Sequence, residues 1–267
     1  MLSLIVFVNI FKCLGEIKTY YYVLQQLVRQ QLILRYRRTV FGYLWTLLNP
    51  ILMMSVTAVV FSALFKADLK TFTIFLFAGM IPWNCFSALV MQSATSFINN
   101  EGLIKKIYLP KLLFPLSISI GVFIDSLLSF AALLIIILVL GGKFSWALLF
   151  IPIAYILLFL FSFGVALLIS VSTVFFRDLQ YVVGIALQAL FFLTPVLYKS
   201  GSLAGKVAWL VKVNPLTAYI DMFRAPLDSA VLPSVLAITN AAVMSFISIA
   251  IGLIFFMKQE KKIVFRL

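Results

Sequence analysis

Catalytic and metal chemistry both need polar side chains that converge, so the acidic residues, histidines and cysteines are considered first. The chain has no histidine and two cysteines, Cys13 and Cys85, and two thiols alone do not complete a zinc site. The acidic residues are scattered singly, mostly near the ends of apolar stretches: Glu16, Asp68, Glu101, Asp125, Asp178, Asp221, Asp228 and Glu260. This pattern predicts a protein that is not an enzyme and that binds no metal ion.

Neither Gly-Lys pair in the sequence forms a phosphate-binding loop. Gly142-Lys143-Phe144 and Gly205-Lys206-Val207 both lack the earlier glycine and the final Ser or Thr that such a loop requires. We therefore expect that the chain alone does not hydrolyse ATP and binds no cofactor of its own.

Asp125 is the one ionisable residue that falls well inside a long apolar run. A carboxylate within a membrane span is a functional candidate by default, so a proton-coupled carrier is one hypothesis. Against it, the other apolar runs contain no second carboxylate, histidine or basic partner, and the sequence has no obvious repeated half. The structural alternative is that Asp125 bonds to Ser126, Ser129 or a neighbouring helix.

The composition indicates that most of this chain lies in a lipid bilayer. Of 267 residues, 64% are apolar and 11% are charged, against about 45–50% and about 25% in soluble domains. Six runs approach or exceed the roughly 20 apolar residues that cross a bilayer, and they are continuous rather than alternating, which excludes a barrel. We predict an all-α membrane protein with six transmembrane helices: Tyr43–Phe65, Phe72–Phe97, Leu112–Leu140, Trp146–Phe176, Leu179–Tyr198 and Leu232–Met257.

The basic residues predict the orientation of these helices. The net charge is +13, and the basic residues sit between the apolar runs, which indicates membrane topology and not nucleic-acid binding. With six spans, fourteen of the 21 Lys and Arg residues share the side of the termini. The positive-inside rule then places both termini in the cytoplasm. The expected organisation is an N-terminal segment (1–40), a permease domain (41–258) and a basic tail (259–267).

Two segments are predicted to be helical without spanning the membrane. Thr19–Arg38 carries an apolar stripe opposite polar residues, which is typical of an interfacial helix, and it ends in a basic cluster, Arg35, Tyr36, Arg37 and Arg38. This cluster suits anionic lipid headgroups or an acidic partner surface, or it serves only as a topology anchor.

Lys199–Val231 contains two short helical patterns, which predict a re-entrant or surface helical hairpin between the fifth and sixth spans. Asn214-Pro215 is a typical helix start, and Pro226 is expected to end that helix. Asp221 and Arg224, three residues apart, are expected to form a surface ion pair. The hairpin either caps a pathway from outside or fills the end of the bundle.

Several ordered motifs carry a resemblance to a known family. They are Leu34-Arg35-Tyr36-Arg37-Arg38-Thr39-Val40-Phe41-Gly42-Tyr43-Leu44-Trp45 with Leu48-Asn49-Pro50, Asn99-Asn100-Glu101-Gly102-Leu103-Ile104-Lys105-Lys106-Ile107-Tyr108-Leu109-Pro110, Phe176-Arg177-Asp178-Leu179, Thr194-Pro195-Val196-Leu197-Tyr198 and Asn214-Pro215-Leu216-Thr217. In this order they resemble the O-antigen and polysaccharide-export permeases of type-2 ATP-binding-cassette transporters. The resemblance covers roughly residues 20–265.

The resemblance implies a homodimer in the bacterial inner membrane that exports lipid-linked polysaccharide, of O-antigen or capsule type. It also implies two copies of a separate ATPase subunit, which would bind the ATP and magnesium. Glu101, Gly102, Leu103, Ile104, Lys105 and Lys106 would then form the element that couples to this ATPase. Alternative cargoes for the same fold are teichoic acid, a glycolipid or a drug.

The aromatic content offers a physical basis for sugar transport. There are 27 Phe, 10 Tyr and 4 Trp residues, and aromatic faces can hold sugar rings without fixing them. Rings that face lipid would explain much of the same count. The residues selected as candidates for the translocation path are Tyr43, Trp45, Phe86, Asp125 and Tyr198.

Overall fold

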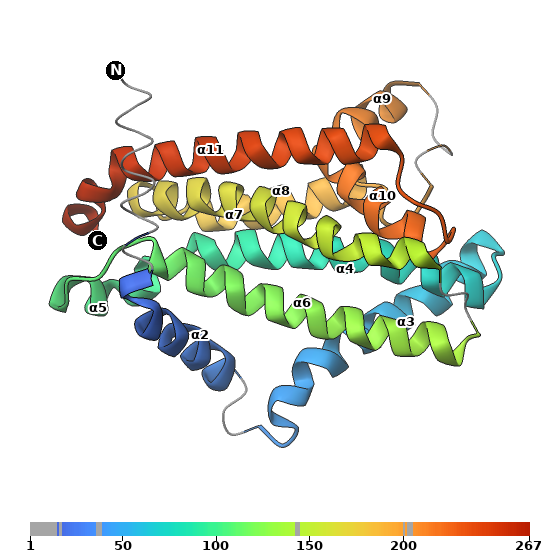
Figure 1. Ribbon diagram of the computed structural model, residues 1–267, viewed down its shortest axis with the longest axis horizontal. Helices are drawn as coiled ribbons and strands as arrows, with labels where there is room; N and C mark the ends of the chain where they lie inside the picture. Colours follow the sequence, from blue (N-terminus) through green and yellow to red (C-terminus); the bar gives the residue numbers. More distant parts are fainter. Residues whose placement is uncertain (1–14, 16–17, 36–38, 142–144, 200, 202–204) are drawn as a thin grey trace.

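The computed structural model describes residues 15, 18–35, 39–141, 145–199, 201 and 205–267, and all regular secondary structure within them is helical. Figure 1 shows an elongated bundle whose long helices run side by side. Five of the described helices are long and apolar enough to cross a membrane: α3 (Trp45–Phe65), α4 (Leu69–Ala94), α6 (Leu113–Val139), α7 (Ile151–Phe175, continued backward by η3, Trp146–Phe150) and α11 (Val235–Arg266). The all-α membrane architecture predicted from the sequence is therefore confirmed.

The fifth predicted span differs from the expectation. Its helix, α8, covers only Leu179–Leu193, and the expected stretch to Tyr198 continues in a non-helical form. A helix of 15 residues is about 22 Å long, shorter than the roughly 30 Å hydrocarbon core. Pro195 explains the end, because proline disfavours the helical conformation of the preceding residue, and Thr194 is extended at φ −100° and ψ 132°.

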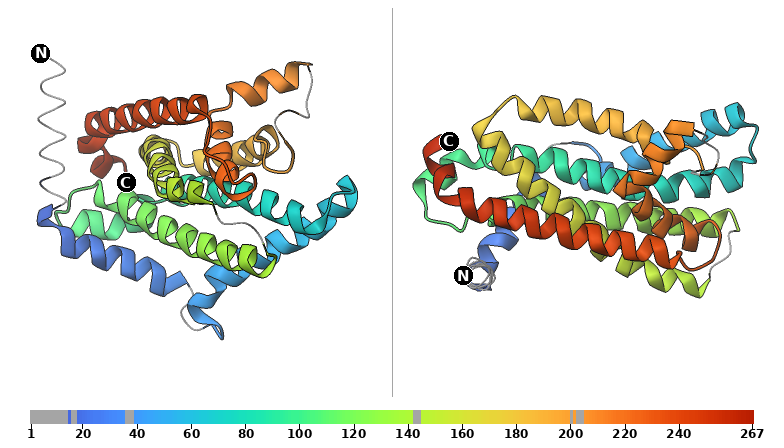
Figure 2. Two further views of the ribbon diagram at one scale, coloured as in Figure 1. Left: turned by 45° about the vertical axis from the view of Figure 1, so that its right-hand side comes forward. Right: turned by 90° about the horizontal axis from the view of Figure 1, so that it is seen from above.

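The helix α4 forms the centre of the bundle, packed against α3, α6, α7 and α8. Figure 2 shows the same arrangement from two further directions, with α8 and α11 on different sides of the bundle. Aromatic rings fill much of the core: Phe86 stacks on Phe161 at 5.6 Å between centroids, and Phe161 stacks on Tyr219 at 5.0 Å. Stacked and edge-to-face rings of this kind add to the packing energy of buried helices.

The closest helix pair is α7 with α11, and small residues make that approach possible. A Cβ added to Gly252 would lie 2.5 Å from the carbonyl oxygen of Gly164, which is too close for any side chain. Two serines of α11 donate across the seam at 2.8 Å, Ser245 to the carbonyl of Leu157 and Ser248 to that of Phe161. Small residues and interhelical hydrogen bonds are what hold membrane helices together, because lipid offers no hydrophobic driving force between them.

The predicted hairpin between the fifth and sixth spans is present as α9 (Gly205–Val213) and α10 (Pro215–Leu227). The side chain of Asn214 accepts a hydrogen bond from the backbone N–H of Leu216 at 3.0 Å, which confirms the predicted helix start. The helix ends one residue beyond Pro226, close to the expected end. Figure 1 shows α9 and α10 at one end of the bundle, and α5 (Glu101–Lys106) with the end of α11 at the other.

The predicted interfacial helix is α2 (Tyr21–Arg35). Its stripe of Leu24, Leu27 and Val28 is buried in a cluster with residues of α6 and α11, while Gln25 and Gln26 are exposed, so the amphipathic pattern is confirmed. Of the basic cluster, Arg35 ends the helix, whereas residues 36–38 and the side chain of Arg35 lie outside the described part of the chain.

Candidate functional site

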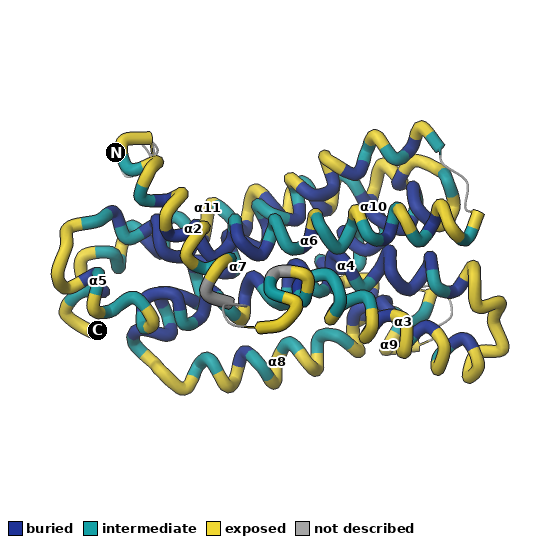
Figure 3. The backbone as a smooth tube through the Cα atoms, turned by 90° about the horizontal axis from the view of Figure 1, so that it is seen from below, coloured by how far each residue is buried: buried dark blue, intermediate teal, exposed yellow. Residues whose placement is uncertain are grey.

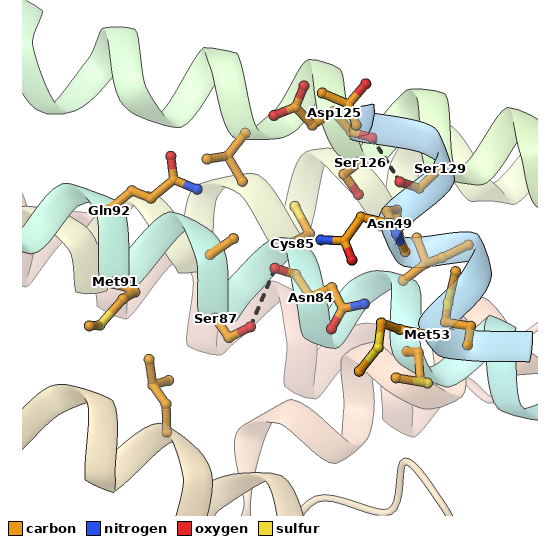
Figure 4. A pocket seen from close by; sticks show the side chains of 18 of the residues that line it. Asn49, Met53, Asn84, Cys85, Ser87, Met91, Gln92, Asp125, Ser126 and Ser129 are labelled. Carbon is orange, nitrogen blue, oxygen red and sulfur yellow. Dashed lines mark hydrogen bonds between the residues drawn. The ribbon is translucent and has the colours of Figure 1, made fainter. Parts of the chain in front are cut away.

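A cavity of about 680 Å³ opens between α3, α4, α6 and α8, within the apolar helices. Its polar lining consists of side chains with amide, hydroxyl or carboxylate groups: Thr46, Asn49, Asn84, Ser87, Gln92, Asp125, Ser126, Ser129 and Gln188. Methionines form much of the apolar lining, namely Met53, Met54, Met80 and Met91. Figure 4 shows these side chains around the open space, with the amide of Asn49 in front of Cys85 and Asn84.

One hydrogen bond joins the α6 wall to α7, and a second lies within α6. Ser129 donates to the backbone carbonyl of Asp125 at 3.0 Å, and the hydroxyl of Tyr155 on α7 donates to the carbonyl of Ser126 at 3.1 Å (Figure 4 shows the first). The lining combines amides and hydroxyls, which both donate and accept, with the single carboxylate of Asp125. Such a surface suits reversible binding of a polar molecule by hydrogen bonds.

Of the predicted path residues, Asp125 lines this cavity. Phe86 is 4% exposed and does not line the cavity, because its ring packs against Trp83 and Phe161. Trp45 packs edge-on against Phe41 at 5.4 Å, and the side chain of Tyr43 lies outside the described part of the chain.

Tyr198 lies elsewhere, beyond the end of α8. Its hydroxyl donates to the carbonyl of Phe192 at 2.9 Å, and its side chain lines a separate cavity beside Phe75 and Lys199. The structure therefore does not bring Tyr198 and Asp125 together.

The described lining of the 680 Å³ cavity contains no aromatic residue. Phe86 is used in a contact between helices, the pair Phe86–Phe161, and the pair Tyr155–Phe223 joins two further helices in the same way. Sequence reasoning missed Asn49, Asn84 and Gln92. A signal was present, because amide side chains are uncommon in apolar spans and mark buried polar sites.

The predicted coupling segment forms a helix of its own, α5, at the same end of the bundle as the end of α11 (Figure 1). Ile104 is buried in the cluster that includes α2, whereas Lys105 and Lys106 are exposed. Lys105 pairs with Glu101 at 2.6 Å, and this hydrogen-bonded pair lowers the pKa of the Glu101 carboxyl. Ile104, with Leu103 partly buried beside it, thus fixes a short helix that presents its charged face outward.

The predicted surface ion pair of Asp221 and Arg224 is wrong about Arg224, which is 7% exposed. The guanidinium donates to the carbonyl of Phe75 at 3.4 Å and also to the carbonyls of Pro195 and Val196. Its carbon lies 3.7 Å from the centre of the Phe75 ring. The burial has a physical reason, because the chain that leaves α8 at Pro195 carries carbonyls without helical partners, and an arginine can serve several at once.

Figure 3 shows α8 along one side of the bundle, with exposed residues over most of its outer face. Tyr181, Val182 and Ile185 are among them, each more than half exposed. One face of α8 therefore packs on the bundle, where it forms a wall of the cavity, and its opposite face is not covered by any other described helix.

Comparison with known proteins gives the family. The model of the ABC-2 type transporter family matches residues 22–227. The chain is 32% identical over 239 residues to the O-antigen export system permease protein RfbA of Klebsiella pneumoniae, covering 88% of this chain and 90% of that protein. It is 29% identical to the RfbA protein of Myxococcus xanthus (79% and 82% covered) and 23% identical to the polysialic acid transport protein KpsM of Escherichia coli (89% and 95%). The chain therefore belongs to the ABC-2 type transporter family of membrane proteins.

Proposed function

We propose that this chain is the permease subunit of an ATP-driven exporter that moves lipid-linked surface polysaccharide across the inner membrane of a bacterium. The observation that carries the proposal is the similarity, along most of the chain, to permeases named for O-antigen export. The cavity supports it, because hydroxyl and amide groups in an apolar bundle provide a place for a polar cargo.

A separate ATPase supplies the energy in this proposal, with ATP and Mg²⁺ bound there and not on this chain. Two permease chains form a homodimer that binds two copies of the ATPase. The helix α5 is the coupling element: Ile104 anchors it to the bundle, and the exposed Lys105 and Lys106 face the partner. The basic cluster at Arg35 to Arg38 binds anionic headgroups or an acidic surface of the partner.

Both termini face the cytoplasm in this proposal, and the hairpin of α9 and α10 faces outward. Two features support that orientation. Fourteen of the 21 basic residues belong to the side of the termini, and α5 lies at the same end of the bundle as the end of α11 (Figure 1).

A proton-coupled carrier is the second candidate, and the position of Asp125 on the cavity wall favours it. A carrier would need its carboxylate to take up and release a proton in each cycle. A permease driven by ATP needs Asp125 only as one polar group among several. Teichoic acid, a glycolipid or a drug are further cargoes that the same family fold would accommodate.

Reconstitution of the purified chain with its ATPase in liposomes separates these functions. Lipid-linked glycan from the native cell should cross the bilayer only when ATP is added, with or without a pH gradient, and the Asp125→Asn variant should keep most of that activity. Transport driven by a pH gradient without ATP, and lost in Asp125→Asn, would show that the chain is a carrier.

A further inference from the structure

A second cavity, of about 330 Å³, lies beside α2 at the end of the bundle that carries α5. It is lined by Leu27, Gln30, Gln31, Gln92, Thr95, Asn99, Asn100 and Ile118. Five of these eight side chains are amides. A cluster of amides is an unusual way to line a cavity in a protein with 64% apolar residues, and it needs a physical explanation.

The two cavities share Gln92 and follow the same helix faces. On α4 and the turn after it, the lining residues are Asn84, Ala88, Gln92, Thr95 and Asn99, at intervals of three or four. Residues at these intervals lie on one face of a helix. From Asn84 to Asn99 this face extends for about 22 Å at a helical rise of about 1.5 Å per residue.

The opposite wall repeats this pattern on α6. Ile118 lines the cavity beside α2, and Val122, Asp125 and Ser129 line the larger one, again at intervals of three or four. Helix α2 packs against α6, and α3 packs against both α4 and α6, so α2 and α3 lie along one side of the bundle (Figure 1). The two cavities therefore lie one after the other along these faces of α4 and α6, and both are lined by Gln92. We call the two together the corridor.

The chemistry of the corridor selects a ligand class. Among the described residues that line it there is no lysine or arginine, and Asp125 is the single ionisable side chain besides the thiol of Cys85. A phosphate or an acidic sugar is normally held by a cation, often a bidentate arginine. Amides hold hydroxyl groups instead, because each both donates and accepts without charge.

Hydrogen bonds orient several of these amides before any ligand is present. Gln31 donates to the hydroxyl of Ser117 at 3.2 Å, Asn99 to the hydroxyl of Thr95 at 3.1 Å and Asn100 to the carbonyl of Ser96 at 2.8 Å. Fixed polar groups bind with less loss of conformational entropy than mobile ones. The wall is thus preorganised for hydroxyl groups.

We infer that the two cavities form one corridor that binds the hydroxyl groups of a glycan whose repeat units carry no net negative charge, with Gln92 as the residue that joins its two parts. This inference rests on the proposed export function and adds a substrate class to it. A polymer with a carboxylate in every repeat would meet no cation along the corridor. Its carboxylates would also come close to the carboxylate of Asp125, which lines the larger cavity.

The first test uses a cell whose own copy of the gene is deleted, complemented with variants, and measures surface glycan and lipid-linked glycan in the inner membrane. Gln92→Leu should lower surface glycan about fivefold, the effect of one lost hydrogen bond, and raise the lipid-linked pool. Gln92→Asn keeps the amide and should restore most of the export. Gln26→Leu, the same change on the exposed face of α2, should export normally. Full export by Gln92→Leu, at wild-type protein level, would overturn the inference.

A second measurement does not depend on the activity of a variant. In a Cys13→Ser background, which keeps the corridor residue Cys85 with its 2% exposed side chain, a cysteine at Gln92 should react with a maleimide in cells that make no glycan, and should be protected when an inactive ATPase traps the glycan. A cysteine at the exposed Ser229 should react equally in both cells. Equal reaction at position 92 would overturn the corridor.

The substrate class has its own readout, which is the chemical composition of the lipid-linked glycan that accumulates. An acidic sugar or a phosphate in every repeat would overturn the neutral class. If deletion of the gene leaves surface glycan unchanged, it is the proposed export function that fails, and not only the neutral substrate class. The deletion strain gives this result before any variant is made.

Discussion

Arg224 shows what a single buried charge does in this protein. Its guanidinium reaches the carbonyls of Phe75, Pro195 and Val196 and covers the ring of Phe75. Gly79 provides the space, because a Cβ there would lie 2.6 Å from a guanidinium nitrogen. One side chain on α10 therefore holds the break after α8 against α4.

Replacing this arginine should destabilise the protein. Arg224→Met leaves the buried carbonyls without a donor, and we expect a loss of about 3 kcal/mol in the free energy of unfolding, the upper end of the range for unsatisfied buried acceptors. The stability of Arg224→Lys should lie between that of Arg224→Met and that of the wild type, because one ammonium group cannot reproduce the planar, forked donor geometry of the guanidinium. Thermal unfolding in detergent measures both.

Lys206→Met is the matched control, because it removes a charge from an exposed position on α9. Its melting temperature should equal that of the wild type. If Arg224→Met melts at the same temperature as Lys206→Met, the contacts of Arg224 do not stabilise the end of the bundle that carries α10.

Between elements, the seam of α7 and α11 is where packing is least tolerant. Gly164 and Gly252 allow the two backbones to approach, and the seam serines bond across it. Gly252→Leu should push the helices apart and cost about 3 kcal/mol or more, at or above the upper end of overpacking effects. The variant should show a lower melting temperature and less folded protein in size-exclusion chromatography.

Ala250→Leu adds a side chain of nearly the same extra volume on the exposed face of α11 and should be tolerated. Equal stability of the two variants would mean that the α7–α11 distance is not fixed by these small residues.

The same scale shows what the sequence could predict and why. Long apolar runs predicted α3, α4, α6, α7 and α11, because the thickness of the bilayer sets the number of consecutive apolar residues that a spanning helix needs. Asn214-Pro215 predicted the start of α10 because capping is local.

Features that depend on contacts distant in sequence could not be predicted. Gln31 and Ser117 meet across 86 positions, and Arg224 and Phe75 across 149, so neither contact follows from local spacing. The end of α8 at Leu193 was also missed, since a proline in a membrane helix kinks it in some proteins and ends it in others. The amides of the corridor were visible in the sequence, but only the pairing of α4 with α6 shows that they line one space.

At the scale of the whole molecule, the bundle has two distinct ends, and the polar corridor extends from the α5 end as far as Met80 on α4 and Ser129 on α6. The end with α5 carries the docking surface that we propose for an ATPase, and the other carries the hairpin held by Arg224 (Figure 1). A cargo that passes between these ends must exchange hydrogen bonds with amides and hydroxyls along the way. The account therefore depends on one central claim, that this chain exports a lipid-linked glycan.

The most direct measurement deletes the gene in its native cell and assays glycan at the surface together with lipid-linked glycan in the inner membrane. The account predicts that surface glycan falls and the lipid-linked pool accumulates on the cytoplasmic side. An intact copy of this chain should restore both only when the partner ATPase is also intact. Unchanged surface glycan in the deletion strain would contradict the account.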